Sequence, residues 1–324
     1  MKPDKPNSSE PMKTTRTRRQ FLQQASAATG AAVLTPIAAS KVAAAQRQPT
    51  LPTIKLGKHD VTRLIIGGNP IYGHSHFNRI LSQYMTAWHT PERVVELLNH
   101  AQANGINTWQ NSYTDRTMSD LDKYREEGGK MHWLSLGKPD WDQKPEMIEI
   151  AAKRKPIGIA PHGALGDRLH RERKTDTLVT LLKRIRGTGV LVGLSAHNPE
   201  LIELAEEKDW PVDYYMCCLY YLTRPREQFQ KLMSGEVPLG EVYLESDPPR
   251  MFKAVRATRK PCLVYKVLAA GRKVDSATQL KAAFEHAFAN IKATDALIVG
   301  MYQQQNDQVA QNTALVREIC GRGA

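Results

Sequence analysis

The chain has 324 residues, of which 41% are hydrophobic and 24% are charged, and it contains four cysteines. This apolar fraction is large enough to bury a core, which excludes disordered and collagen-like classes, and four cysteines are too few for a disulfide scaffold. The formal net charge is +12, but no long basic run is interleaved with aromatic residues, so we expect no nucleic-acid partner. No stretch of about 18 uninterrupted apolar residues occurs, which predicts that there is no stable membrane anchor.

Residues 1–45 are predicted to be an export signal. Arg18 and Arg19 precede a Phe-Leu pair, a weakly apolar stretch of small residues covers 25–39, and three alanines at 43–45 offer a cleavage site. A basic region, an apolar region and a small-residue site in this order are typical of such signals. A basic amphipathic first helix is the alternative. The segment holds seven Lys and Arg and two Asp and Glu, so its removal leaves a charge of +7, which still allows a basic mouth for an anionic ligand or cofactor.

The arginine pair followed by Phe-Leu resembles a bacterial twin-arginine signal. That resemblance implies a periplasmic or secreted protein that meets the twin-arginine translocase during export. It also gives a hint of a bound cofactor, since this route generally carries proteins that fold first.

After a linker and a short capping hairpin, predicted at 46–58, short apolar runs alternate with segments of helical spacing. The runs lie at 64–66, 108–110, 133–136, 156–160, 190–194, 214–219, 262–265 and 296–299. Continuous apolar runs without strict alternation are typical of strands buried on both faces. The helical segments include 90–98, 175–185, 198–207 and 277–288.

Eight such units over about 260 residues predict one (β/α)8 barrel, a TIM barrel, at 59–324, with its active residues at the carboxyl ends of the strands. A doubly wound α/β sheet is the alternative fold. It is disfavoured because no GxGxxG fingerprint follows the first strand.

Four segments resemble the aldo-keto reductases, and together they span the chain after residue 46. The stretch 56–68 resembles the opening hairpin and first strand of that family, and 105–109 resembles the start of its second strand. The stretch 189–195 resembles the fifth strand, and 297–301 with Asn312 resembles the eighth strand and the helix after it. The resemblance implies an exported oxidoreductase that uses NAD or NADP and acts on a carbonyl or sugar-derived small molecule.

The family uses a catalytic aspartate, tyrosine, lysine and histidine, and this sequence matches two of the four. Lys138 and His162 match the lysine and the histidine, whereas Gln110 stands at the aspartate position and Asp115 at the tyrosine position. Gln110 cannot ionise, and a carboxylate such as Asp115 is a poor acid at neutral pH. Tyr113 is the nearby phenol that can take the tyrosine's role. The resemblance therefore implies a non-standard tetrad made of Lys138, His162, Tyr113 and Gln110.

The resemblance also implies cofactor-binding residues, and this sequence matches the family at only some of those positions. The candidates are Ser195, His197, Leu268, Gly271, Arg272 and Asn312. Ser195 matches the serine of the fifth strand, but the asparagine expected beside it is replaced by an alanine and His197. Leu268, Gly271 and Arg272 belong to a loop that resembles the one crossing the pyrophosphate, where an arginine suits a phosphate. Glutamines at 303–305 replace the basic residues that commonly hold a 2′-phosphate, so the choice between NAD and NADP stays open.

Two further functions remain open. In a lyase, isomerase or hydrolase that reuses the barrel, Lys138 would hold an enolate while His162 or His197 moves protons. Lys266, at the exit of the seventh run, is either a site residue or a solvated rim residue. The last alternative is a non-catalytic ligand-binding barrel.

A divalent metal is the less favoured cofactor. His74 and His76 form an H-x-H pair after the first run, and together with Lys138, His162 and His197 they resemble the ligands of metal-dependent barrel hydrolases. The carboxylate expected after the eighth run is absent from 298–301.

Overall fold

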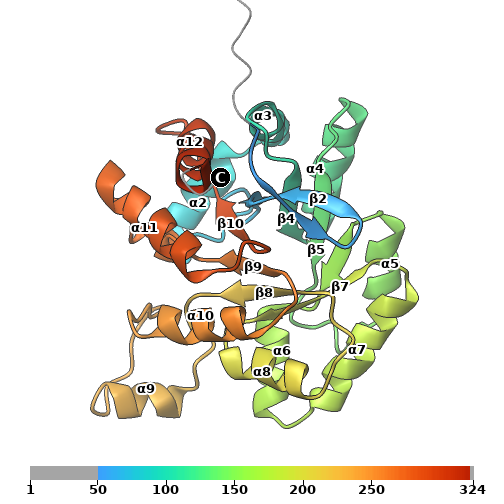
Figure 1. The fold of residues 1–324 in the computed structure, drawn as a ribbon, viewed down its shortest axis with the longest axis vertical. Helices are drawn as coiled ribbons and strands as arrows, with labels where there is room; N and C mark the ends of the chain where they lie inside the picture. Colours follow the sequence, from blue (N-terminus) through green and yellow to red (C-terminus); the bar gives the residue numbers. More distant parts are fainter. Residues whose placement is uncertain (1–49, 322–324) are drawn as a thin grey trace, which may run out of the picture. The chain divides into compact units, whose positions relative to one another are not determined.

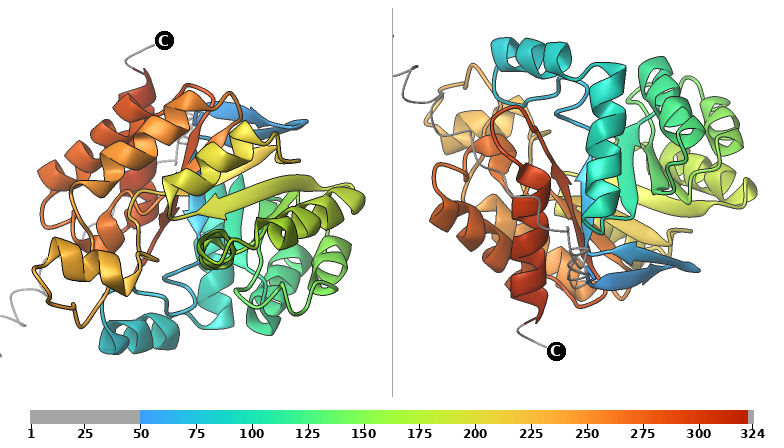
Figure 2. Two further views of the ribbon diagram at one scale, coloured as in Figure 1. Left: turned by 90° about the horizontal axis from the view of Figure 1, so that it is seen from below. Right: turned by 90° about the horizontal axis from the view of Figure 1, so that it is seen from above.

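The structure, a computed structural model, describes residues 50–321, so the predicted export signal lies outside the described residues. Eight parallel strands close into a barrel in the order β10-β3-β4-β5-β6-β7-β8-β9, and the helices surround it (Figures 1 and 2). The strands are β3 (Leu64–Gly67), β4 (Thr108–Ser112), β5 (His132–Leu136), β6 (Gly158–Ala160), β7 (Leu191–Ala196), β8 (Tyr214–Cys218), β9 (Cys262–Tyr265) and β10 (Ala296–Gly300). This confirms the predicted (β/α)8 barrel, and every predicted apolar run forms or overlaps a strand.

The helices alternate with the strands along the chain. They are α2 (Arg79–Trp88), α3 (Pro91–Ala103), α4 (Asp115–Glu126), α5 (Met147–Lys153), α6 (Gly163–Arg171), α7 (Thr175–Gly187), α8 (Pro199–Glu207), α9 (Arg226–Leu232), α10 (Asp247–Ala257), the 3₁₀ turn η1 (Ala269–Gly271), α11 (Ala277–Asn290) and α12 (Gln308–Gly321). Gly105 and Gly189, which precede β4 and β7, have φ of 93° and 80°, a backbone conformation that glycine adopts without steric cost. None of these helices is long and apolar enough to cross a membrane.

An antiparallel hairpin precedes the barrel. It consists of β1 (Thr53–Leu56) and β2 (His59–Thr62), so it extends four residues beyond the boundary predicted at 58. Ile54, Leu56 and Val61 belong to the same buried cluster as Tyr214 and Ala296, which begin strands of the barrel. The hairpin therefore closes the amino-terminal end of the barrel, and the opposite end holds the mouth.

The barrel interior is filled by side chains rather than open. Tyr214 is fully buried there, and two glycines make room for its ring. A Cβ atom at Gly193 would lie 2.4 Å from Tyr214 Cζ, and one at Gly158 would lie 2.9 Å from Tyr214 Cε1. Such contacts are too close for any other residue without movement of the ring.

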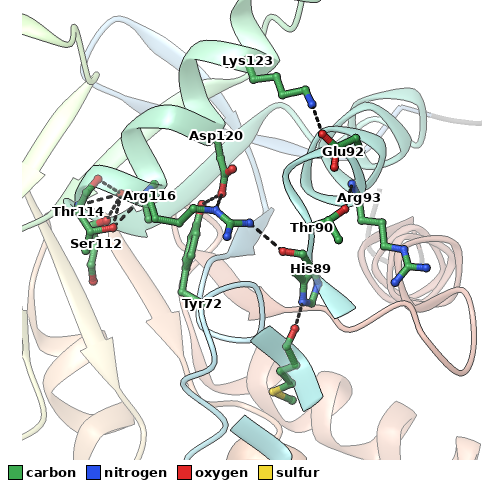
Figure 3. A network of polar contacts seen from close by, with 12 residues as sticks. Tyr72, His89, Thr90, Glu92, Arg93, Ser112, Thr114, Arg116, Asp120 and Lys123 are labelled. Atoms are coloured by element: carbon green, nitrogen blue, oxygen red, sulfur yellow. Dashed lines mark hydrogen bonds and ion pairs between the residues drawn. The ribbon is translucent and has the colours of Figure 1, made fainter. Parts of the chain in front are cut away.

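A polar network on the outside fixes the loop that leaves β3 (Figure 3). Tyr72 in this loop donates a hydrogen bond of 3.1 Å to Asp120 Oδ2 on α4, and Arg116 Nε donates to the same oxygen at 2.8 Å. Arg116 Nη2 also donates to the backbone oxygen of His89, after α2, at 2.8 Å. The network thereby ties α2 and the loop at 68–78 to α4.

Candidate functional site

A cavity of about 370 Å³ lies among the loops that follow β3, β9 and β10. Because these strands are parallel, the loops meet at the carboxyl end of the barrel, where barrel enzymes carry their active residues. The predicted candidates in its wall are His74, His76, Gln110, Lys266, Leu268 and Gly271. The cavity is thus the place where the largest number of sequence candidates come together.

Lys266 and Tyr265 both face this cavity. Successive residues of a strand point to opposite sides, but Lys266 has a φ of 67°, which ends the strand and lets both side chains reach the mouth. Burial is the main cause that lowers the pKa of Lys266 to about 8; Cys218 and Glu241 oppose this shift, and the positive charge of Arg272 adds to it. No hydrogen bond or ion pair joins Lys266 Nζ to another residue of the described chain.

His162 follows β6 and caps α6. Its Nδ1 accepts a hydrogen bond of 3.1 Å from the backbone N–H of Ala164. Burial is the main cause that lowers the pKa of His162 to about 4; the neighbouring His197, His74 and His76 add to this shift, and Asp167 opposes it. The ring is therefore neutral near pH 7, and because Nδ1 is an acceptor, its proton lies on Nε2.

His197 follows β7 and is paired with a buried carboxylate. Its Nδ1 lies 2.8 Å from Asp167 Oδ2, and Asp167 is only 2% exposed. Asp167 also accepts hydrogen bonds from the backbone N–H groups of His197 and Asn198 and from the hydroxyl of Thr223. Three further donors hold this carboxylate, so Nδ1 of His197 carries the proton that it shares with Asp167. The Nε2 lone pair of His197 is then left to accept a proton.

Close packing places His197 beside Ser195 and Tyr265, of which Tyr265 lines the cavity. A Cβ atom at Gly163 would lie 2.8 Å from His197 Cε1 and 3.1 Å from Ser195 Oγ, so glycine is needed at the start of α6. Ser195 Oγ lies 3.3 Å from the phenol oxygen of Tyr265, and the rings of His197 and Tyr265 are 6.0 Å apart between centroids. Ser195 and Tyr265 thereby connect the histidines to the cavity that Lys266 lines.

The other tetrad candidates lie elsewhere. Tyr113 and Asp115 line an outer depression together with Arg154, so the structure does not bring them to His162. Lys138 is exposed, because the turn after β5 buries Trp141 instead. The candidate tetrad is therefore not assembled as a unit.

Of the remaining cofactor candidates, Arg272 contacts other parts of the chain and Asn312 is buried. The Arg272 guanidinium lies 4.1 Å from the ring centroid of Tyr243 and 5.0 Å from that of Phe77, and Nη1 donates to the backbone oxygen of His76 at 3.1 Å. Asn312 is buried on α12, at 3% exposure. Leu268 and Gly271 line the cavity, whereas Arg272 and Asn312 are not among its lining residues.

Sequence reasoning missed Asp167 and Tyr265. A signal for Asp167 exists, because an aspartate on the buried face of an amphipathic helix, between Gly166 and Leu169, requires a partner. Among residues 50–321, no group of three or more His, Cys, Asp or Glu side chains is placed to hold a metal ion.

No protein-family model and no curated protein matches the chain in sequence. Among solved structures, a truncated 3-deoxy-D-arabino-heptulosonate 7-phosphate synthase from Thermotoga maritima is similar, with a TM-score of 0.50 and 14% identity over 86% of this chain and 94% of that one. The glycerol dehydrogenase AKR11B4 from Gluconobacter oxydans has a TM-score of 0.49 and 12% identity over 83% and 95%. At these identities, similarity extends to the fold alone. The chain is a (β/α)8-barrel protein whose mouth holds two neighbouring histidines and a half-buried lysine.

Proposed function

We propose that the protein is an enzyme that moves a proton at the carbon next to the carbonyl group of a small molecule, as lyases and isomerases do. The observation that carries this proposal is the contrast in the Nδ1 contacts of two neighbouring histidines, one facing a backbone donor and the other a carboxylate. His197 offers a basic Nε2 supported by Asp167, and His162 offers an N–H on Nε2. A base and a donor in one mouth are the groups needed to form and stabilise an enolate.

In this mechanism His197 Nε2 accepts the proton from carbon, and Asp167 stabilises the imidazolium that forms. His162 Nε2–H donates a hydrogen bond to the oxygen on which negative charge develops. A histidine that stays neutral near pH 7 suits this role, because it donates without first losing a proton to solvent. Gln110, in the cavity wall, orients the ligand.

Hydrogen exchange with solvent tests this function without knowledge of the natural substrate. Pyruvate, dihydroxyacetone and glycolaldehyde are incubated with the protein in D₂O, and loss of the C–H signal is followed by NMR. We expect catalysed exchange with at least one probe, lowered by about 10²–10⁴-fold in His197→Ala and in His162→Ala. His170→Asn, on the outer helix α6, is the control that keeps the rate. Absence of catalysed exchange with all three probes contradicts the proposal.

A nicotinamide-dependent carbonyl reductase is the second candidate. It is favoured by one observation, that Leu268 and Gly271 of the loop resembling the pyrophosphate-crossing loop line the cavity. Consumption of NADPH or NADH with the same three probes supports this candidate. We also propose that the protein is exported to the periplasm or beyond it through the twin-arginine route, on the strength of residues 1–45.

A further inference from the structure

Lys266 has unusual surroundings for a lysine of the described chain. Its side chain lines the cavity at the barrel mouth, and no hydrogen bond or ion pair holds its nitrogen. Removing a charged amine from water without a partner costs free energy, and burial accordingly lowers the pKa of Lys266 to about 8. A larger fraction of this amine than of an ordinary lysine is therefore neutral, and nucleophilic, near neutral pH.

The backbone at Lys266 adds a second observation. Its φ of 67° lies in the left-handed region, which non-glycine residues adopt rarely and at a cost. Glycine would relieve this cost, but it would remove the amine. The conformation places Lys266 beside Tyr265 at the cavity, so the fold retains a strained lysine where a ligand would bind.

We propose that Lys266 Nζ attacks the carbonyl carbon of a small ketone or aldehyde in this cavity and forms an iminium ion with it. The amine lone pair forms the C–N bond, and the carbonyl oxygen then leaves as water with the two protons of the amine. One proton taken up from solvent charges the imine nitrogen. This inference rests on the proposed function, because the positive nitrogen draws electrons from the adjacent C–H bond, whose proton His197 accepts. The intermediate is then an enamine in place of an enolate, and His162 Nε2–H donates its hydrogen bond to the carbonyl oxygen before that oxygen leaves as water.

The surroundings of the amine fit such a substrate in size and charge. A volume of about 370 Å³ is within the range of small-molecule sites. His74 and Arg272 lie close enough to Lys266 to interact with it electrostatically, and Glu241, the facing carboxylate, is paired with His76 at 2.8 Å. Cys218 faces the amine too, and burial raises the pKa of that thiol to about 12, so it remains uncharged. Burial lowers the pKa of His74, so its ring adds little positive charge at neutral pH. The positive charge of Arg272 favours a carbonyl compound that carries a carboxylate, for which pyruvate is the probe.

Reductive trapping tests the proposal directly. The protein without residues 1–45 is incubated with pyruvate and cyanoborohydride, which reduces an iminium to a stable amine, and the modified lysines are located by peptide mass spectrometry. We expect Lys266 to be modified at least ten times faster than Lys183, an exposed lysine on α7. Its rate should level off above about pH 8, because the neutral amine then predominates. Lys183→Arg should leave this fast phase unchanged, and Lys266→Arg should abolish it.

The outcomes separate this inference from the function on which it rests. Modification of Lys266 no faster than that of Lys183 overturns the inference, as does catalysed hydrogen exchange that persists at the full rate in Lys266→Arg. Fast trapping at Lys266 without catalysed exchange supports the iminium and contradicts the proton-transfer function. Dihydroxyacetone, a neutral ketone, tests the charge preference, and its trapping at a rate equal to that of pyruvate contradicts the preference for an anion.

Discussion

The neutral state of His162 is set by its surroundings. Burial and three neighbouring histidines lower its pKa from 6.5 to about 4 in the folded chain. Between these values the unfolded chain binds a proton that the folded chain does not, so the free energy of unfolding falls as the pH decreases through this window and is unaffected above it. From pH 7 to pH 5, this one ring should lower the free energy of unfolding by about 2 kcal/mol.

The variant His162→Asn isolates this effect. Asparagine retains a side-chain acceptor for the N–H of Ala164, since it is a good helix N-cap, but it does not titrate. The free energy of unfolding is measured in urea at pH 7 and at pH 5. We expect it to fall between these pH values by about 2 kcal/mol less in the variant than in the wild type. His170→Asn should behave as the wild type. Equal pH dependence in the wild type and His162→Asn would show that His162 titrates normally in the fold.

Sequence alone predicted which residues leave the strands but not where their side chains point. Lys138 and His162 both follow an apolar run, and only His162 joins the site. The difference arises from packing after the strand: a Cβ atom at Gly137 would lie 2.5 Å from Trp141 Cε3, so the turn buries that tryptophan and leaves Lys138 outside. Such a contact between two residues of one turn has no periodic signature in the sequence.

At the scale of elements, the attachment of α4 to the loop after β3 makes a testable contribution to stability (Figure 3). Asp120→Ala removes the common acceptor of Tyr72 and Arg116 and leaves the half-buried phenol of Tyr72 without this hydrogen bond. We expect the free energy of unfolding in urea to fall by about 1.5–3 kcal/mol, the range for hydrogen bonds to a charged group. Asp122→Ala, on the same helix, removes a solvent-exposed pair with Arg154 and should cost about 0–1 kcal/mol. Equal losses in the two variants would contradict a structural role for the network.

The elements themselves were largely predictable, because strands buried on both faces leave continuous apolar runs. Segments without such a signal could not be predicted. The helix α9 has seven residues and buries none of them, so its sequence carries no apolar stripe. The predicted boundary at 58 falls four residues before the end of the hairpin at Thr62, for a related reason. His59 and Asp60 are polar, yet they pair with Leu56 and Lys55 across β1 and β2, and pairing through the backbone does not require apolar residues.

At the scale of the whole molecule, the topology of the barrel bears on how the chain would be exported. The barrel closes only when β10 pairs with β3, joining Leu297 to Leu64, so most of the chain must be synthesised before the fold is complete. A route that carries folded proteins suits this order of events, and the arginine pair near the start of the chain supports the proposal that this route is used.

Replacing Arg18 and Arg19 together with lysine tests the proposed route. The positive charge is retained, but the paired guanidinium groups are lost, and lysine does not reproduce their planar hydrogen-bonding geometry. In cell fractionation followed by immunoblotting, we expect the double variant to remain in the cytoplasm with residues 1–45 attached. Arg16→Lys, in the same basic region, should be exported and processed like the wild type. Normal export of the double variant would contradict the twin-arginine route. It would not affect the description of the barrel and its mouth.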